Sequence, residues 1–160
     1  TGGILASASS SGAGKAFCAG QDLSEAVDDS GPGIERIVRE HYNPIIEKIR
    51  ALEKPVVCVV NGVAAGAGAN IALACDIVIA GTSVAFIQAF SKIGLIPDSG
   101  GTFFLPRLVG FGKASELMML GDKVSATDAE RMGMIYKVVD DPLLQDEALA
   151  IAKTLSELPT

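Results

Sequence analysis

The stretch VVCVVNGVAAGAGANIALACDI, residues 56–77, decides the fold. A continuous apolar run at 56–60 leads into a glycine- and alanine-rich turn at 62–68, and a helix-forming apolar run follows at 69–74. This order predicts a buried strand, a tight glycine loop and a helix whose first amides face a cavity. Helix N-termini bind anions and also stabilise oxyanions that form during reactions. A second glycine-rich turn, LIPDSGGT at 95–102, contains an acid, and the two turns together favour enolate chemistry.

The composition predicts one globular domain. The chain has 160 residues, of which 49% are hydrophobic, so it is long enough and apolar enough to bury a core. Polar residues interrupt every apolar run before it reaches the length of a bilayer span. The net charge is −6, from 19 acids and 13 bases, and this balance disfavours nucleic acid and anionic membranes as partners.

The cysteines and the N-terminal segment predict a cytoplasmic location. Cys18, Cys58 and Cys75 form an odd set without CxxC spacing, which is typical of reduced, buried thiols. Residues 1–12 lack the basic and apolar parts of a secretory signal. With a single histidine, His41, the chain is poorly equipped for a zinc site, and we expect no metal.

The hydrophobic pattern alternates between strands and helices, which predicts an α/β fold with a largely parallel sheet. Pro44 should kink or split the longest helix. Residues 15–23 are expected to form a turn-rich connection, and residues 90–93 fit no clear pattern. The expected strands are 4–8, 56–60, 76–80, 85–88 and 136–139, and the expected helices are 34–52, 66–74, 101–109, 113–120, 126–132 and 142–158.

Three familiar nucleotide or hydrolase motifs fit poorly. The glycine turn at 62–68 lacks the third small residue of GxGxxG, and Asp76 begins the next strand instead of ending it. The segment 9–16 departs from a P-loop at both Ser9 and Ala16. A catalytic triad with His41 has no GxSxG nucleophile. For residues 62–68, close strand–helix packing and an oxyanion site therefore both stay open.

Three motifs, found in this order, resemble the crotonase superfamily of enoyl-CoA hydratases and isomerases. They are FCAGQDL (17–23), KPVVCVVNGVAAGAGANIALACDI (54–77) and AFSKIGLIPDSGGTFFLPRLVG (89–110). Within the superfamily the likeness is strongest to the phenylacetate-degradation isomerases, which convert a ring-epoxide of phenylacetyl-CoA to an oxepin-CoA. The resemblance implies the crotonase-like ββα spiral (the ClpP/crotonase fold) in a single core domain over residues 1–160, without the family's opening strands and C-terminal helical region.

The resemblance also implies a site for a CoA thioester. The backbone N–H groups of Gln21 and Ala67 would form an oxyanion hole for the thioester carbonyl. Lys15 would approach the CoA phosphates, although a solvated surface lysine is an equal alternative. No cofactor is implied beyond the CoA that carries the substrate. The path of adenine and pantetheine would be lined by Ala19, Gln21, Asp22 and Leu23.

Two departures from the hydratase pattern favour an isomerase. The two glutamates of the hydratases match Asn70 and Phe90 here, and neither can transfer protons; both would instead contact the acyl group. Asp98 stands where family isomerases place an acid, and one carboxylate suits a proton shuttle. Apolar neighbours, with Phe86, Phe90 and Leu95 as candidates, would raise its pKa. An aspartate before residues 100–102 could also serve as a helix N-cap.

We therefore expect an acyl-CoA isomerase acting on ring-epoxide phenylacetyl-CoA or on an enoyl-CoA. One alternative is an enoyl-CoA hydratase, a lyase, in which Asp98 alone handles water. Another is an inactive CoA-binding fragment or assembly subunit, since the chain is short for the family. A dinucleotide binder is the most remote alternative. The family also implies a homo-trimer or hexamer, and His41 or Tyr42 could reach the acyl pocket.

Overall fold

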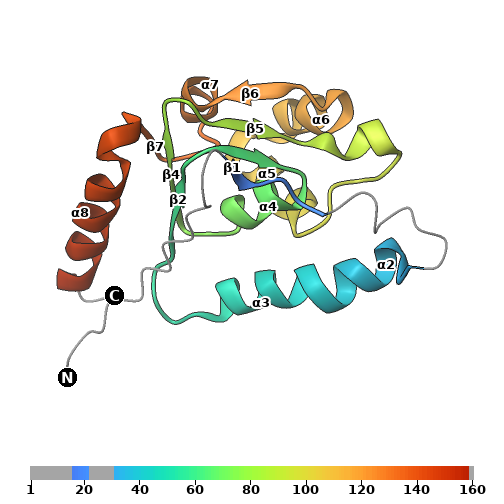
Figure 1. The fold of residues 1–160 in the computed structure, drawn as a ribbon, viewed down its shortest axis with the longest axis horizontal. Coiled ribbons are helices and arrows are strands. Elements are labelled where there is room, and N and C mark those ends of the chain that lie inside the picture. The colour runs from blue at the N-terminus through green and yellow to red at the C-terminus, as the bar shows by residue number, and fades with distance from the viewer. Residues whose placement is uncertain (1–15, 22–30, 159–160) are drawn as a thin grey trace.

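The computed structural model describes residues 16–21 and 31–158, and Figure 1 shows its strands between surrounding helices. Within this part the strands form two sheets, ordered β1-β3-β5-β6 and β2-β4-β7. Every neighbouring pair runs parallel except β5 and β6, which confirms the expected α/β class with largely parallel pairing. The strands are β1 (Ala16–Cys18), β2 (Val57–Val60), β3 (Val63–Ala65), β4 (Ile77–Gly81), β5 (Ala85–Ile87), β6 (Lys123–Ser125) and β7 (Lys137–Val139).

The helices cover these sheets from several sides, and most match the expected ranges to within a few residues. Ser125 caps α7, because its side chain accepts a hydrogen bond from the backbone N–H of Asp128. The helices are α2 (Gly33–Ile37), η1 (Val38–Tyr42), α3 (Asn43–Ala51), α4 (Ala67–Leu73), η2 (Ala89–Ile93), α5 (Gly101–Val109), α6 (Phe111–Leu120), α7 (Ala126–Arg131), η3 (Asp141–Leu143) and α8 (Leu144–Glu157).

The interruption expected at Pro44 is a widened turn within one continuous rod. Segment η1 is a π-helix, and the N–H of Asn43 donates to the carbonyl of Val38, five residues earlier. Proline has no backbone N–H to donate, and the widened turn stands directly before Pro44, so the regular hydrogen-bond pattern changes there while the rod continues. Figure 1 shows α2 and α3 lying end to end below the sheets.

Three short strands correct the expected pattern. β1 lies within the predicted turn-rich connection, β3 lies within the predicted glycine turn, and β6 was not predicted at all. Each has three residues and depends on a partner strand, since β3 pairs with both β1 and β5. Local propensity is weak in such segments, and pairing decides their conformation. The strand expected at 4–8 lies outside the described residues.

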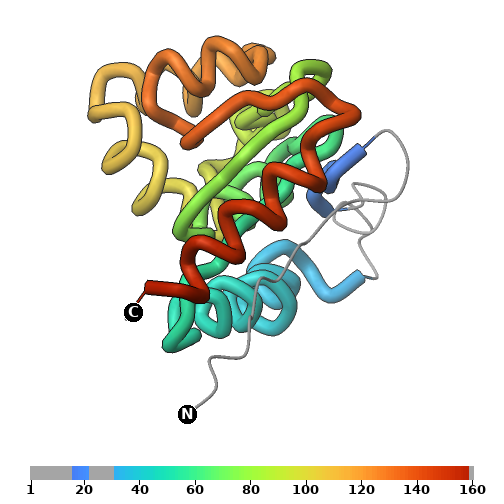
Figure 2. Tube along the Cα trace, turned by 90° about the vertical axis from the view of Figure 1, so that its left-hand side faces the viewer, coloured from blue at the N-terminus to red at the C-terminus, as the bar shows by residue number. Residues whose placement is uncertain are grey.

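The core has two parts. The larger one joins α4, α5, α6 and α7 to the strands, and Phe86 and Leu105 are among its most buried side chains. The smaller one holds α8 against the second sheet, through Leu144 and Ala148 on the helix and Val59 and Ile79 on the strands. Figure 2 shows α8 crossing this side of the molecule.

Asp76 fixes the start of β4, as its position suggests. One carboxylate oxygen accepts a hydrogen bond of 2.8 Å from the N–H of Val56, and the other pairs with Arg50 at 2.7 Å. Arg50 also donates to the carbonyl of Ala74 at 3.1 Å. One arginine of α3 therefore holds both the end of α4 and the beginning of the second sheet.

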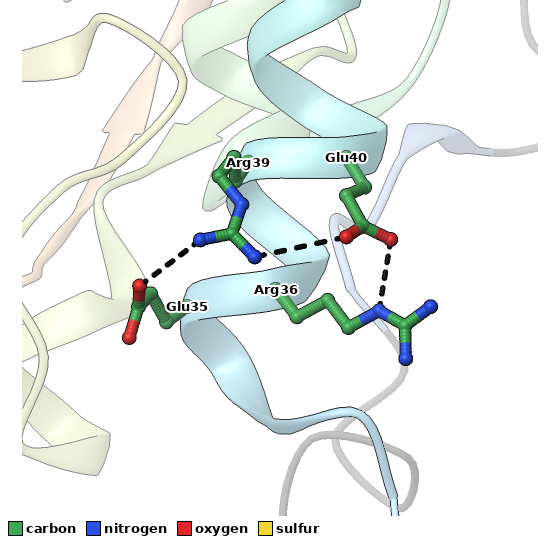
Figure 3. A network of polar contacts seen from close by, with 4 residues as sticks. All are labelled: Glu35, Arg36, Arg39 and Glu40. Atoms are coloured by element: carbon green, nitrogen blue, oxygen red, sulfur yellow. Dashed lines mark hydrogen bonds and ion pairs between the residues drawn. The ribbon is translucent and has the colours of Figure 1, made fainter.

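Ion pairs lie on the exposed surface of α2 and η1. Figure 3 shows Arg39 between Glu35 and Glu40, while Glu40 also binds Arg36 at 2.8 Å. The pairing raises the pKa of Arg36 and lowers the pKa of Glu40 through their hydrogen bond. All four side chains are largely exposed, so these pairs support helical conformation and are screened by salt.

No helix in the described part of the chain is both long enough and apolar enough to cross a membrane.

Candidate active site

One apolar cavity of about 250 Å³ lies where the loop after β1, the start of α4, the η2 segment and the 95–98 loop converge. Ile34 of α2 contributes to its wall, so the long rod borders the cavity too. Among the residues expected at the site, it brings together Ala19, Gln21, Ala67, Phe90, Leu95 and Asp98. It also includes residues that were not predicted, namely Gly20, Ile34, Gly66, Ala89, Lys92 and Ile93.

The start of α4 lies on this cavity, because Ala67 is one of its lining residues. Ala67 is the first residue of the helix, and the backbone amide of such a residue has no acceptor one turn earlier within the helix. Gly20 packs against it with a φ of +86°, and a Cβ at this position would lie 3.3 Å from the Ala67 nitrogen. Glycine therefore meets the backbone conformation and leaves room for a ligand atom in front of the amide.

Gln21 is held from the side by the π segment. The Tyr42 hydroxyl donates to Oε1 of Gln21 at 3.1 Å. π segments occur often at functional sites, and here the segment carries the tyrosine that fixes a cavity residue. Tyr42 itself does not line the cavity, and neither does His41, which is exposed.

Asp98 is the one carboxyl group among the described residues that line the cavity. Its side chain accepts a 2.8 Å hydrogen bond from the hydroxyl of Ser99, a residue that is 1% exposed and has a φ of 50°. Burial raises the pKa of the Asp98 carboxyl above its ordinary value, and the Ser99 hydroxyl opposes part of this shift. The direction agrees with the expectation from apolar surroundings. A half-buried carboxyl with a raised pKa can exchange protons at a pH closer to neutrality.

The alternative role of Asp98 as a helix cap is wrong. Helix α5 begins at Gly101, its N-cap residue is Gly100, and no side chain caps it. The N–H of Gly101 donates instead to the backbone carbonyl of Asp98 at 2.8 Å. The carboxylate is therefore free of the capping role and lies on the cavity.

Two residues expected in the pocket wall lie elsewhere. Asn70 is fully buried and does not line the cavity; its amide donates to the carbonyl of Asp98 at 2.9 Å. Phe86 is 2% exposed and belongs to the main core, and like the other residues of β5 it does not line the cavity. Of the three apolar neighbours expected beside Asp98, Phe90 and Leu95 line the cavity and Phe86 does not.

Three expected CoA contacts cannot be placed, because Lys15, Asp22 and Leu23 lie outside the described residues. Of the unexpected lining residues, Ala89, Lys92 and Ile93 come from η2, a short 3-10 helix that overlaps the segment where the pattern indicated no element. Their spacing carried no usable signal. Within the residues described, no group of three His, Cys, Asp or Glu side chains could hold a metal ion.

Among the described residues, the cavity thus combines an apolar wall, one carboxyl group and the first residue of a helix. This set suits proton transfer next to a carbonyl whose oxygen is bound by amides. Residues 10–160 match the family model for enoyl-CoA hydratase/isomerase, and the chain belongs to this family. The crotonase-like fold expected from the motifs is confirmed by the solved structures of this family.

Among its relatives is the 1,2-epoxyphenylacetyl-CoA isomerase of Escherichia coli K12, which is 52% identical over 152 residues. A probable enoyl-CoA hydratase of Rhodobacter capsulatus is 46% identical over 149 residues. Each match covers 93% of this chain and 58% of the relative, so the chain spans little more than half the length of these proteins. A putative enoyl-CoA hydratase/isomerase from Mycobacterium abscessus superposes with a TM-score of 0.85 at 43% identity, over 91% of this chain and 57% of the other.

Proposed function

We propose that this protein is an acyl-CoA isomerase that moves a proton with a single carboxylate. The observation that carries the proposal is the cavity, where Asp98 is the one carboxyl group among the described lining residues. The resemblance matches the two glutamates of the hydratases to Asn70 and Phe90, which cannot transfer protons. Phe90 lines the same cavity and contributes to its apolar wall. Asn70 donates its side-chain amide hydrogen bond to the backbone carbonyl of Asp98. The identity to an isomerase that acts on an epoxyphenylacetyl-CoA supports this choice.

In the proposed reaction of an enoyl-CoA, the thioester carbonyl accepts hydrogen bonds from the backbone N–H groups of Gln21 and Ala67. The ionised Asp98 removes a proton from the carbon next to the carbonyl, and the electron pair moves onto the carbonyl oxygen. The oxyanion is stabilised by the two amides, each typically worth about 3 kcal/mol of barrier. Asp98 then returns the proton two carbons further along, the carbonyl re-forms and the double bond has moved.

Two acyl groups fit this proposal, the ring-epoxide of phenylacetyl-CoA and a linear enoyl chain. The apolar wall from Phe90 and Leu95 accepts either, since neither acyl group carries a charge. The CoA portion would run past Ala19 and Gln21 towards Lys15, Asp22 and Leu23. Assembly into a homo-trimer or hexamer and a cytoplasmic location stay predictions.

The enoyl-CoA hydratase is the second candidate, favoured by the relative from Rhodobacter capsulatus. It requires a group that activates water, and Asp98 would have to supply both the base and the acid. Formation of 3-hydroxyacyl-CoA from 2-enoyl-CoA would favour it. Acyl-CoA binding without any turnover would instead indicate an inactive CoA-binding or assembly subunit.

The deciding experiment is proton NMR of 3-enoyl-CoA in heavy water with the wild type and with Asp98→Asn, alongside turnover of the ring-epoxide substrate. We expect deuterium at the carbons flanking the double bond with the wild type and loss of this exchange in the variant. Asp122→Asn serves as the matched control, because Asp122 is exposed and does not line the cavity. Full exchange and full turnover by Asp98→Asn would contradict the proposed role of Asp98.

A further inference from the structure

A buried chain of hydrogen bonds leads from β5 through α4 to the Asp98 turn. Gln88 donates through Nε2 to Oδ1 of Asn70 at 2.8 Å, and Asn70 donates through Nδ2 to the carbonyl of Asp98 at 2.9 Å. Gln88 is 5% exposed and Asn70 is 0% exposed. Neither amide is solvated, so their hydrogen bonds have no competition from water.

The direction of this chain is fixed by its last member. A backbone carbonyl can only accept, so Asn70 must direct its NH₂ group at Asp98 and its oxygen at Gln88. Gln88 must then donate through its own NH₂ group to Asn70, and this leaves its Oε1 as an acceptor outside the chain of hydrogen bonds. Among the described residues, this Oε1 is the one buried side-chain oxygen or nitrogen without a hydrogen-bond partner. An unpaired buried oxygen destabilises a fold, so a packing role alone would be served better by an apolar side chain.

The Asp98 turn fits closely around the Asn70 amide. A Cβ at Gly101 would lie 2.7 Å from Cγ and 2.8 Å from Oδ1 of Asn70, which is inside van der Waals contact. The N–H of Gly101 donates to the Asp98 carbonyl as well, at 2.8 Å, so this carbonyl is held from both α4 and α5. The backbone of Asp98 therefore has little freedom to shift relative to α4.

We infer that Asn70 is a positioning residue for Asp98 and that Gln88 holds Asn70 in the required orientation. Asn70 lies one turn after Ala67 on the same helix, so its bond sets the distance between the Ala67 amide and the Asp98 carboxyl. A proton shuttle needs this distance to match the separation of the thioester oxygen from the reacting carbons. Asn70 does not line the cavity, so it acts through Asp98 without touching the substrate. The inference rests on the proposed function.

The test compares Asn70→Leu with the wild type on whichever proposed substrate the wild type turns over. Leucine fills a similar space and donates no hydrogen bond, so the Asp98 turn is released while the cavity wall stays in place. We expect kcat to fall about 10- to 100-fold and KM to stay within about twofold, as for loss of a group that orients a catalytic residue. Gln88→Met, which keeps the length of the side chain, should lower kcat about 3- to 10-fold.

Val59→Ala is the matched control, because Val59 is fully buried in the second core and distant in the fold from the cavity residues. It should lower the midpoint of thermal unfolding without changing kcat or KM per folded molecule. If Asn70→Leu and Gln88→Met change kcat no more than this control does, or raise KM with kcat unchanged, the positioning role is overturned. Should Asn70→Leu fail to fold, Gln88→Met decides the matter alone.

Asp98→Asn, measured in parallel, separates this inference from the proposed function. A nearly inactive Asp98→Asn together with unaffected Asn70 and Gln88 variants would overturn the positioning role alone. A fully active Asp98→Asn, or a wild type that turns over neither substrate, would overturn the proposed function and with it this inference. Losses in kcat for all three variants would support both.

Discussion

Replacing Gly68 by alanine tests whether the contact between α4 and β1 sets the geometry of the cavity. Gly68 is the second residue of α4 and lies directly against Cys18. A Cβ at this position would lie 2.7 Å from Cβ and 2.8 Å from the carbonyl carbon of Cys18, and closer still to the carbonyl oxygen. Ordinary contact begins at 3.4 Å, so the helix and the strand would have to separate by roughly 0.7 to 1 Å.

This separation has two expected costs. Overpacking at a close contact typically destabilises by about 1–3 kcal/mol, and the better helix propensity of alanine returns up to about 1 kcal/mol. We therefore expect the free energy of unfolding to fall by about 1–2 kcal/mol. The Ala67 amide moves with the helix, and a shift of about 1 Å in a catalytic group can lower turnover by about 100-fold. We expect kcat/KM to fall about 10- to 100-fold.

Urea unfolding followed by circular dichroism and steady-state turnover measure the two effects. Gly112→Ala in α6 is the matched control, because a Cβ there meets no atom within 4 Å. It should leave turnover unchanged and stabilise the protein by up to about 1 kcal/mol. If Gly68→Ala keeps wild-type turnover while folded, the position of α4 against β1 does not set the oxyanion site, and the reasoning is refuted.

The remaining predictions concern three polar contacts. Ser99→Ala removes the hydroxyl that stabilises the ionised form of Asp98, so the pKa of Asp98 should rise further. The acid limb of the plot of kcat against pH, where protonation of Asp98 removes the base, should therefore move to higher pH. Tyr42→Phe removes a hydrogen bond to Gln21, typically worth about 1 kcal/mol, and should lower kcat/KM about 2- to 10-fold in steady-state assays. Asp76→Ala should lower the free energy of unfolding in urea by about 1–2 kcal/mol, because it frees the N–H of Val56.

Each of these changes has a control on the surface. Ser115→Ala removes a hydroxyl that bonds only within α6 and should leave the acid limb in place. Tyr136→Phe changes a tyrosine that is 65% exposed, and Glu53→Ala changes an exposed acid. An acid limb that Ser99→Ala leaves in place or moves to lower pH would contradict its role. The prediction for Tyr42→Phe is contradicted if Tyr136→Phe lowers kcat/KM equally, and the prediction for Asp76→Ala is contradicted if Glu53→Ala lowers the free energy of unfolding equally.

The sequence pattern predicted correctly those elements whose own residues favour a strand or a helix. The apolar run before Asn61 and the helix after Gly66 lie within one or two residues of their expected bounds. β3 was missed because the Val-Ala-Ala segment between them has no local preference for a strand. Its conformation depends on pairing with β1 and β5, and no local pattern reports such pairing.

The candidate site shows the same division. The resemblance to the family predicted that Gln21, Ala67 and Asp98 meet at one site. They line one cavity in the structure, although they come from three separate parts of the chain. The pocket wall was harder to predict, because an apolar side chain such as Phe86 suits a cavity wall and a core equally well, and the structure places Phe86 in the core. Asn70 required knowledge of the turn that closes on it, and that turn is formed by residues 28 positions later.

The π segment has a consequence for insertions and deletions along the rod. A regular α-helix advances by about 100° per residue, and a widened turn takes up one extra residue while the parts on either side keep their facing. Here Ile34 lines the cavity while Arg50, further along the same rod, reaches the second sheet. Deleting one residue from 38–42 would let this turn close into a regular α-helix with both ends facing as before, whereas deleting one elsewhere in the rod would turn one end by about 100° against the other. After a deletion outside the widened turn, the rod could contact the cavity or the second sheet, but not both. The number of residues in its regular parts is therefore under tighter constraint than the identity of its exposed side chains.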